Sequence, residues 1–246
     1  MRPPEYIQTI QSDSEQVPRV NEHEKSVAFF ERHRAYFEQF AGHGIEVKAA
    51  PPQLNTFAFD LNNNTIYLTD KFYKLLGYAD EGTSFATHHE IEHFREKLAL
   101  LQEEGGAEVF AAYLRKLDEK VSPHAEAFSV MDNCISDVRQ NSSVVERTHA
   151  GFDAVEKKLY TDVQFPEVDF TEGKSKQPLH IQLPYAILNE YRSGRKCIVD
   201  ERVRKIIDDL QHTPHPDGGT RDIFAMMTNP DPKIVPMSIR LRLQDA

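Results

Sequence analysis

Residues 83 to 104 read TSFATHHEIEHFREKLALLQEE, and this stretch defines the central element of the chain. Thr83 or Ser84 can cap a helix, because its hydroxyl can accept a hydrogen bond from a first-turn backbone amide that has no partner within the helix. Gly105 and Gly106 follow, and glycine is typical of helix ends. The sequence therefore predicts one helix from about residue 83 to residue 104.

The regions on either side of this helix differ in their secondary structure. Before it, Ile45–Lys48 is predicted as a strand, and Phe57–Asp60 and Thr65–Leu68 flank an asparagine-rich turn as a β-hairpin. A short helix is predicted to end at Gly77. Apolar spacing and helix-start signals predict further helices, with breaks between some of them: helices at 22–40, 107–120, 122–148, 180–191 and 200–210, breaks at 160–178 and 213–219. The expected fold class is α+β, mostly helical, with a small hairpin or sheet beside the central helix.

The composition is that of an ordinary globular protein, with 39% hydrophobic and 28% charged residues. A net charge of −10, from 29 basic and 39 acidic residues, argues against nucleic acid as a partner, since binding it depends on neutralising phosphates. No apolar run approaches the ~18 residues needed to span a membrane, and the N-terminus lacks the apolar stretch of a secretory signal. We therefore expect a cytoplasmic protein with no membrane partner.

The residues of the central helix suggest a metal site. The chain has only two cysteines, which form no Cys-x-x-Cys pair, so a metal site would draw on carboxylates and on the eleven histidines. His89 and His93 are four residues apart, which places both on one side of a helix, where their imidazole nitrogens can bind one metal ion. Glu90 follows the first histidine, where its carboxylate can reach a metal-bound water rather than the metal. Glu90 is therefore the predicted general base.

This His-Glu-x-x-His segment, inside a predicted helix and shortly after a predicted hairpin, resembles the active-site helix of the zincin metallopeptidases. The resemblance covers residues 55 to 141, and only the motif itself is specific. In that family, an edge strand lies above the active-site helix and holds an extended substrate. The resemblance implies a Zn²⁺-dependent hydrolase, with a metallopeptidase acting on a peptide or protein substrate as the first expectation.

A zinc site of this type needs a third protein ligand, and no third histidine follows at the metzincin spacing. Residues 132–141 resemble the Asn-x-x-Glu-Asp-x-Arg element of bacterial metallopeptidases associated with von Willebrand factor A domains. Asn133, Asp137 and Arg139 match that element, whereas Ser136 stands in place of its glutamate. Asp137 is the predicted third ligand of a gluzincin-like centre.

Alternatives stay open around that assignment. Asp132 and Glu126 are the reserve third ligands, and Asn141, one turn after Asp137, is a candidate to support it from behind.

Two further residues of the motif helix are expected to have no direct role. His88 faces about 100° away from His89, so we expect it to be structural or to lie at the edge of the pocket. Glu92 is expected to be a solvated side chain rather than a base.

Three regions are predicted along the chain: a flexible arm at 1–20, a zincin-like metal-binding domain at 21–160 and a helical C-terminal extension at 161–246. Residues 236–246 begin an amphipathic helix that stops without a cap, so we expect the natural chain to be longer. That expectation, together with the serine at position 136, favours an alternative function. In it, the chain is a zinc-stabilised, catalytically inactive binding module within a larger assembly.

Overall fold

The computed structural model describes residues 20–42, 44–51, 58–60, 63–68, 80–118, 125–148, 151–216, 218–231 and 233–240. The chain forms two compact units, Met1–Phe94 and Arg95–Ala246. The predicted arm, the short helix ending at Gly77 and the predicted helix start at residue 122 lie outside the described residues, apart from Val20. None of the helices in the described ranges is long and apolar enough to cross a membrane. The domain boundaries expected from the sequence stay a prediction.

The first unit contains one long helix and a small sheet. Its elements are α1 (Val20–Ala41), β1 (Glu46–Ala49), β2 (Ala58–Asp60) and β3 (Thr65–Leu68). Strand β3 lies in the middle, parallel to β1 and antiparallel to β2, so the predicted hairpin is confirmed. The parallel pairing of β1 was not predicted.

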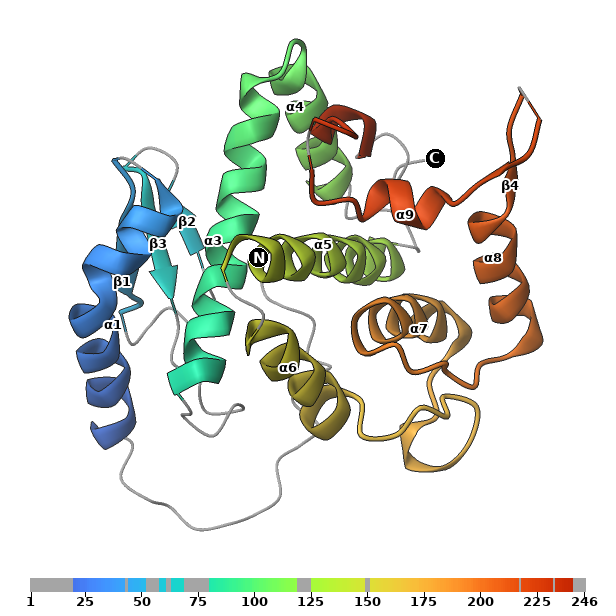
Figure 1. Cartoon of the computed structure of the whole chain (residues 1–246), viewed down its shortest axis with the longest axis horizontal. Helices are drawn as coiled ribbons and strands as arrows, with labels where there is room; N and C mark the ends of the chain where they lie inside the picture. The colour runs from blue at the N-terminus through green and yellow to red at the C-terminus, as the bar shows by residue number, and fades with distance from the viewer. Residues whose placement is uncertain are drawn as a thin grey trace. The chain divides into compact units, whose positions relative to one another are not determined.

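Helix α1 covers this sheet, as Figure 1 shows in blue beside the strands, and it packs against β1. The core of the unit forms where apolar side chains of the helix and the strands are removed from water. Phe30 and Phe37 of α1 are almost fully buried, as are Val47 of β1 and Ile66 and Leu68 of β3. Ile66 and Leu68 are two residues apart on β3, so both point to the same face of the sheet, which is the face in the core.

The central helix is α3 (Asp80–Gln102), which begins three residues before its predicted start and ends two before its predicted end. Its end is fixed by glycine, as expected. A Cβ atom at Gly106 would lie 1.7 Å from the carbonyl oxygen of Leu100, so only glycine fits there. Gly105 has a φ angle of +69°, which glycine adopts at low cost.

The second unit is helical and centres on the packing of α7 against α5 (Figure 1). Buried apolar residues from these two helices and their neighbours form a single cluster that includes Cys134, Val138, Tyr160 and Ile187. In order, its elements are α4 (Gly106–Asp118), α5 (Ala125–Arg147), α6 (Gly151–Lys158), a π-helix η2 (Leu159–Gln164), a 3₁₀ helix η3 (Gly173–Ser175), α7 (Leu179–Ser193), α8 (Glu201–Gln211), β4 (Thr213–Pro214), β5 (Thr220–Arg221) and α9 (Ile223–Met227).

The mostly helical α+β fold class is confirmed, and the differences from expectation are local. The break predicted at 160–178 contains the π-helix and the 3₁₀ helix. The break at 213–219 joins two short antiparallel strands, β4 and β5. Both are short elements whose stability comes from the surrounding packing, which a single-sequence pattern does not report.

Candidate metal centre

His89 and His93 lie one turn apart on α3 and point to the same place. Their Nε2 atoms are 3.0 Å apart, and their rings meet edge to face with centroids 4.6 Å apart. Both side chains are half-buried. This is the arrangement that the i, i+4 spacing predicts, because a helix brings such residues one above the other.

The separation of the two nitrogens fits a shared metal ion. Two ligands at typical zinc–nitrogen distances and a tetrahedral angle stand roughly 3.3 Å apart. A direct hydrogen bond between neutral imidazoles would also bring the nitrogens close, but it needs a proton on one Nε2 atom. A metal instead takes the lone pairs of both nitrogens.

Asp137 of α5 completes the set. One ligand atom from each of His89, His93 and Asp137 lies within 4.8 Å of the other two, and all three residues are half-buried. Two imidazoles and a carboxylate are a donor set that suits a divalent metal and leaves a position open for water. These three predicted ligands therefore form a cluster that can hold a metal ion.

The carboxylate of Asp137 is oriented by a neighbour on its own helix. Asn133, one turn earlier, donates from Nδ2 to Oδ2 of Asp137 at 3.2 Å. Asn133 and Asp137 both belong to the sequence element from which the third ligand was predicted. In the structure these two residues are hydrogen-bonded to each other.

The arginine of that element serves a different purpose. Arg139 Nε donates to Oε1 of Glu96 at 2.6 Å, and its Nη1 donates to the carbonyl oxygen of Met227 at 3.2 Å. Its side chain is 3% exposed, so the contact with Glu96 is a buried ion pair between α5 and α3. Glu96 lies one turn after His93, and Arg139 lies two residues after Asp137. Sequence reasoning missed Glu96, because no local pattern shows which residue of α3 meets α5.

Glu90 lies on α3, next to the first histidine, and is half-buried. Within the described residues, the ligand cluster is made without it. The role predicted for Glu90, which is to act on a water rather than to bind the metal, stays a prediction.

Of the two reserve ligands, the structure describes the side chain of Asp132. Asp132 accepts a 2.6 Å hydrogen bond from the Tyr113 hydroxyl through Oδ2 and is not part of the cluster. Burial, followed by the charge of Asp132, raises the pKa of Tyr113 well above its usual range, so this phenol keeps its proton. The side chain of Glu126 lies outside the part of the chain that the structure describes.

Two neighbours of the motif are buried. His88 has no exposed surface and lies against the rings of Tyr36, Phe37 and Phe40. Its Nδ1 is 2.6 Å from the carbonyl oxygen of Ser84, so Nδ1 carries the proton, which confirms the structural expectation. The expectation for Glu92 is wrong: this residue is 4% exposed and not solvated. Helix α3 is buried around much of its circumference, and some of its polar residues, among them Thr87, His88 and Glu92, are buried with it.

The most informative residue that sequence reasoning missed is Tyr160. It is buried in the π-helix, and its hydroxyl accepts a hydrogen bond from Asn141 Nδ2 at 2.8 Å. Asn141 was predicted to support Asp137, and the structure gives it this bond to Tyr160. No local sequence pattern indicates the pairing, because the two residues lie on different helices.

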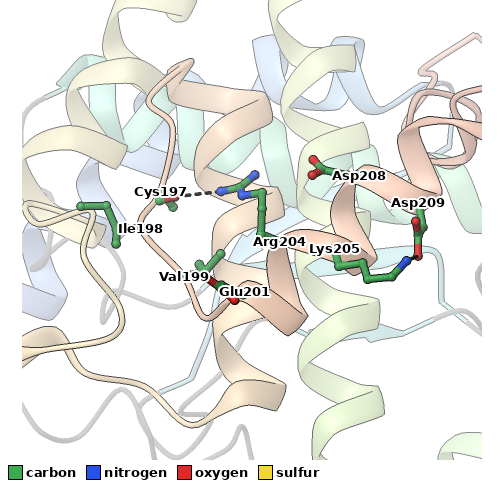
Figure 2. A pocket seen from close by; sticks show the side chains of 8 residues that line it. All are labelled: Cys197, Ile198, Val199, Glu201, Arg204, Lys205, Asp208 and Asp209. Carbon is green, nitrogen blue, oxygen red and sulfur yellow. Dashed lines mark hydrogen bonds and ion pairs between the residues drawn. The ribbon is translucent and has the colours of Figure 1, made fainter.

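A pocket of about 450 Å³ lies elsewhere, on α8 and the segment before it, as Figure 2 shows. Its cations are already paired within the chain. Arg204 donates to both carboxylate oxygens of Glu190 and to the carbonyl oxygen of Cys197, and Lys205 pairs with Asp209. We therefore assign no ligand to this pocket. It is lined by Cys197, Ile198, Val199, Glu201, Arg204, Lys205, Asp208 and Asp209.

A function for this chain has to be argued from the geometry of its residues. The resemblance to the zincin metallopeptidases rests on the motif of α3 and on the matching positions of α5. Comparisons with protein-family models, with curated proteins and with solved structures find no match to the chain.

Proposed function

We propose that this protein is a zinc-dependent hydrolase and, more specifically, a metallopeptidase. The observation that carries the proposal is the cluster of His89, His93 and Asp137, whose ligand atoms lie within 4.8 Å of one another. The cluster joins the two histidines of a His-Glu-x-x-His motif to a carboxylate 44 residues later in the sequence, which belongs to the segment predicted to supply the third ligand.

Zinc is the metal that this donor set suits best. Imidazole nitrogens bind the borderline first-row ions well, whereas magnesium and calcium prefer sites made of oxygen atoms. Three protein ligands, rather than four, are typical of catalytic zinc sites, because the fourth position takes water or substrate. When bound, the zinc would lower the pKa of a water at that position and polarise a substrate carbonyl.

The residues of the chain would divide the remaining work. The two histidines and Asp137 hold the metal, and Asn133 fixes the direction of the Asp137 carboxylate. Glu90, half-buried beside His89, accepts the proton of the water as it attacks the carbonyl carbon. The same carboxyl group then delivers that proton to the leaving amine, which restores Glu90 to its starting state.

A peptide substrate is supported by the small sheet in the unit that carries both histidines. Strand β2 is at one edge of that sheet, where its outer backbone groups are not used by β3. An extended peptide can add to such an edge through main-chain hydrogen bonds. This mode of binding matches the edge-strand arrangement that the zincin resemblance implies.

Two variants test the proposal together. Glu90→Gln should keep one zinc per chain, measured by elemental analysis, while cleavage of a broad peptide library should fall by roughly 10²-fold or more, because the proton acceptor is gone. His93→Ala should lose both zinc and cleavage.

Three results would contradict the proposal. Undiminished cleavage by Glu90→Gln would exclude Glu90 as the base. Equal zinc loss in both variants would make Glu90 a ligand. An unmodified protein that binds zinc and cleaves nothing would favour the binding module in place of the peptidase.

A further inference from the structure

Helix α3 meets α1 through His88, the residue just before the first histidine of the metal cluster. The His88 side chain has no exposed surface and lies among three aromatic rings of α1. The ring centroids are 4.4 Å away for Phe40, 5.3 Å for Tyr36 and 5.5 Å for Phe37, and all three rings meet His88 edge to face. These four residues all belong to the first unit. One turn of α1 therefore encloses the His88 ring.

Two hydrogen bonds give this ring a fixed direction. Nδ1 donates to the carbonyl oxygen of Ser84 at 2.6 Å, so in the neutral imidazole Nε2 has a lone pair to offer. The Tyr36 hydroxyl lies 3.1 Å from Nε2 and donates to it. Apolar contacts attract without a preferred direction, whereas a hydrogen bond is strong only over a narrow range of angles. The Tyr36–His88 bond therefore ties α3 to α1 in one orientation.

The orientation of α3 about its own axis decides where the two predicted ligands point. Successive residues of a helix are about 100° apart around its axis, so fixing His88 also fixes the direction of His89 and of His93. A side-chain end about 6 Å from the axis moves by about 1 Å when the helix turns by about 10°. A functional site has to be held to within about 0.5 Å and 10–20°. A small rotation of α3 would therefore be enough to spoil the site.

We propose that Tyr36 and His88 are positioning residues for the metal centre: their hydrogen bond fixes the rotation of α3, and so aims the nitrogens of His89 and His93 at one ion. Neither residue touches the metal. The inference rests on the proposed metal centre and adds to it a support that comes from α1, a helix that supplies no ligand to the cluster.

The test measures metal binding separately from stability in variants of the whole chain. Tyr36→Phe removes only the hydroxyl that donates to His88, and Tyr36 is 48% exposed, so the fold should tolerate the change. The double variant Tyr36→Phe/His88→Phe replaces both partners by apolar rings. Tyr191→Phe is the matched control, because its hydroxyl lies 3.3 Å from a carboxylate oxygen of Asp222 in the second unit.

Affinities for Zn²⁺ and Co²⁺ are measured by competition with a chelator. The visible absorption of the Co²⁺ form reports the number and geometry of its ligands. Thermal melting in excess chelator gives the stability of each variant without metal, so a weakened fold is not mistaken for a weakened site.

Tyr36→Phe should weaken the binding of both ions by roughly tenfold, and the double variant by up to roughly 100-fold, the range typical for loss of a group that orients a ligand. Both should change the Co²⁺ spectrum, because the two nitrogens no longer meet the ion at the same angles. The double variant should still melt close to the unmodified chain in chelator, since replacing both partners of a buried hydrogen bond by apolar groups can be nearly neutral. Tyr191→Phe should change neither affinity nor spectrum.

Three results would overturn the inference, and they differ from one another. Unchanged affinity and spectrum in both variants would show that the Tyr36–His88 bond has no part in the centre, while the centre itself would stand. An affinity loss that appears only together with a lower melting midpoint in chelator would make the bond a support of the fold alone. Failure of the unmodified protein to bind either ion would remove the metal centre and the inference with it.

Discussion

Arg139 of α5 donates a 2.6 Å hydrogen bond to Glu96 of α3, and both side chains are largely removed from water. The pair joins the helix of His89 and His93 to the helix of Asp137, one turn beyond the cluster on α3. Both partners belong to the second unit, so the contact is internal to it. It fixes the position of α5 along the second half of α3.

Arg139→Met should reduce the free energy of unfolding by about 3–5 kcal/mol, because it leaves the Glu96 carboxylate in a buried position without its cation. Urea denaturation measures the loss. The double variant with Glu96→Leu should recover much of it, since burying two apolar side chains leaves no unpaired charge. Arg202→Met is the control, because Arg202 is 73% exposed and its pair with Asp200 is solvated. A loss in Arg139→Met no larger than in this control would contradict the prediction.

Metal removal should lower stability, by an amount that depends on the logarithm of the free metal concentration relative to its Kd. A ligand that binds only the folded state, present at 100 times its Kd, stabilises that state by about 2.7 kcal/mol. Thermal denaturation with zinc and with excess chelator should therefore give two different midpoints. His93→Ala, which lacks a ligand, should melt at the same temperature in both conditions. If the melting midpoint of His93→Ala still differed between zinc and chelator, the stabilising metal would be bound at another site.

The pair of Glu156 on α6 and Arg192 on α7 should be a large contributor to the stability of the second unit. Glu156 is fully buried, and the Arg192 guanidinium also donates to the Ser142 hydroxyl at 2.7 Å. Arg192→Met should lower the free energy of unfolding by about 3–5 kcal/mol, because it leaves the buried Glu156 carboxylate without its cation.

The same helix provides the control for this prediction. Lys157 pairs with Asp153 at 2.7 Å, but both side chains are exposed. Lys157→Met should change the free energy of unfolding by less than about 0.5 kcal/mol. Similar losses in Lys157→Met and Arg192→Met would show that burial does not set the cost here.

Both cysteines should be poor nucleophiles in the folded protein. Burial raises the pKa of Cys134 well above the usual value, and it raises the pKa of Cys197 to about 11. At pH 8 the native protein should therefore react with a thiol reagent far more slowly than the protein in urea, because the thiolate is the reactive form. Rapid labelling of the native chain, measured by absorbance or mass, would contradict the burial of these thiols.

The same thiols predict the direction of a pH effect. A thiol pKa that is higher in the folded state than in the unfolded chain favours folding while both states hold the proton. For Cys197 this stabilisation is complete below its ordinary pKa of 9.0 and is lost as the pH rises toward about 11. Cys197→Ala should therefore show a smaller decline in unfolding free energy over that alkaline range than the unmodified chain.

The parts of the site that follow from local spacing could be predicted from the sequence. His89 and His93 face one point because helical geometry places residues four apart on one side. Asp137 was predicted from the resemblance of residues 132–141 to a metallopeptidase element, and its ligand atom does lie close to those of the two histidines. The hairpin of β2 and β3 was predictable for a similar reason, since its two strands are neighbours in the sequence.

What could not be predicted depends on contacts between distant segments. Strand β1 pairs in parallel with β3, which a local pattern does not specify. Glu96 and Tyr160 acquire their partners on α5, Arg139 and Asn141, only when that helix meets α3 and the π-helix. Glu92 was expected in solvent because an isolated charged residue usually lies there, but the packing around α3 buries it.

Tyr160 lies in the π-helix at Leu159–Gln164. The direction of its side chain therefore depends on how many residues this segment contains, as well as on which residues they are. A π turn closes its hydrogen bond over five residues where an α turn closes it over four, so it accommodates one residue more. Deleting one residue between Tyr160 and Phe165 would restore ordinary winding and turn the two rings relative to each other by about 100°. The loss or gain of a single codon in this segment would therefore be enough to break the stacking of Tyr160 on Phe165 while every predicted metal ligand stayed in the gene.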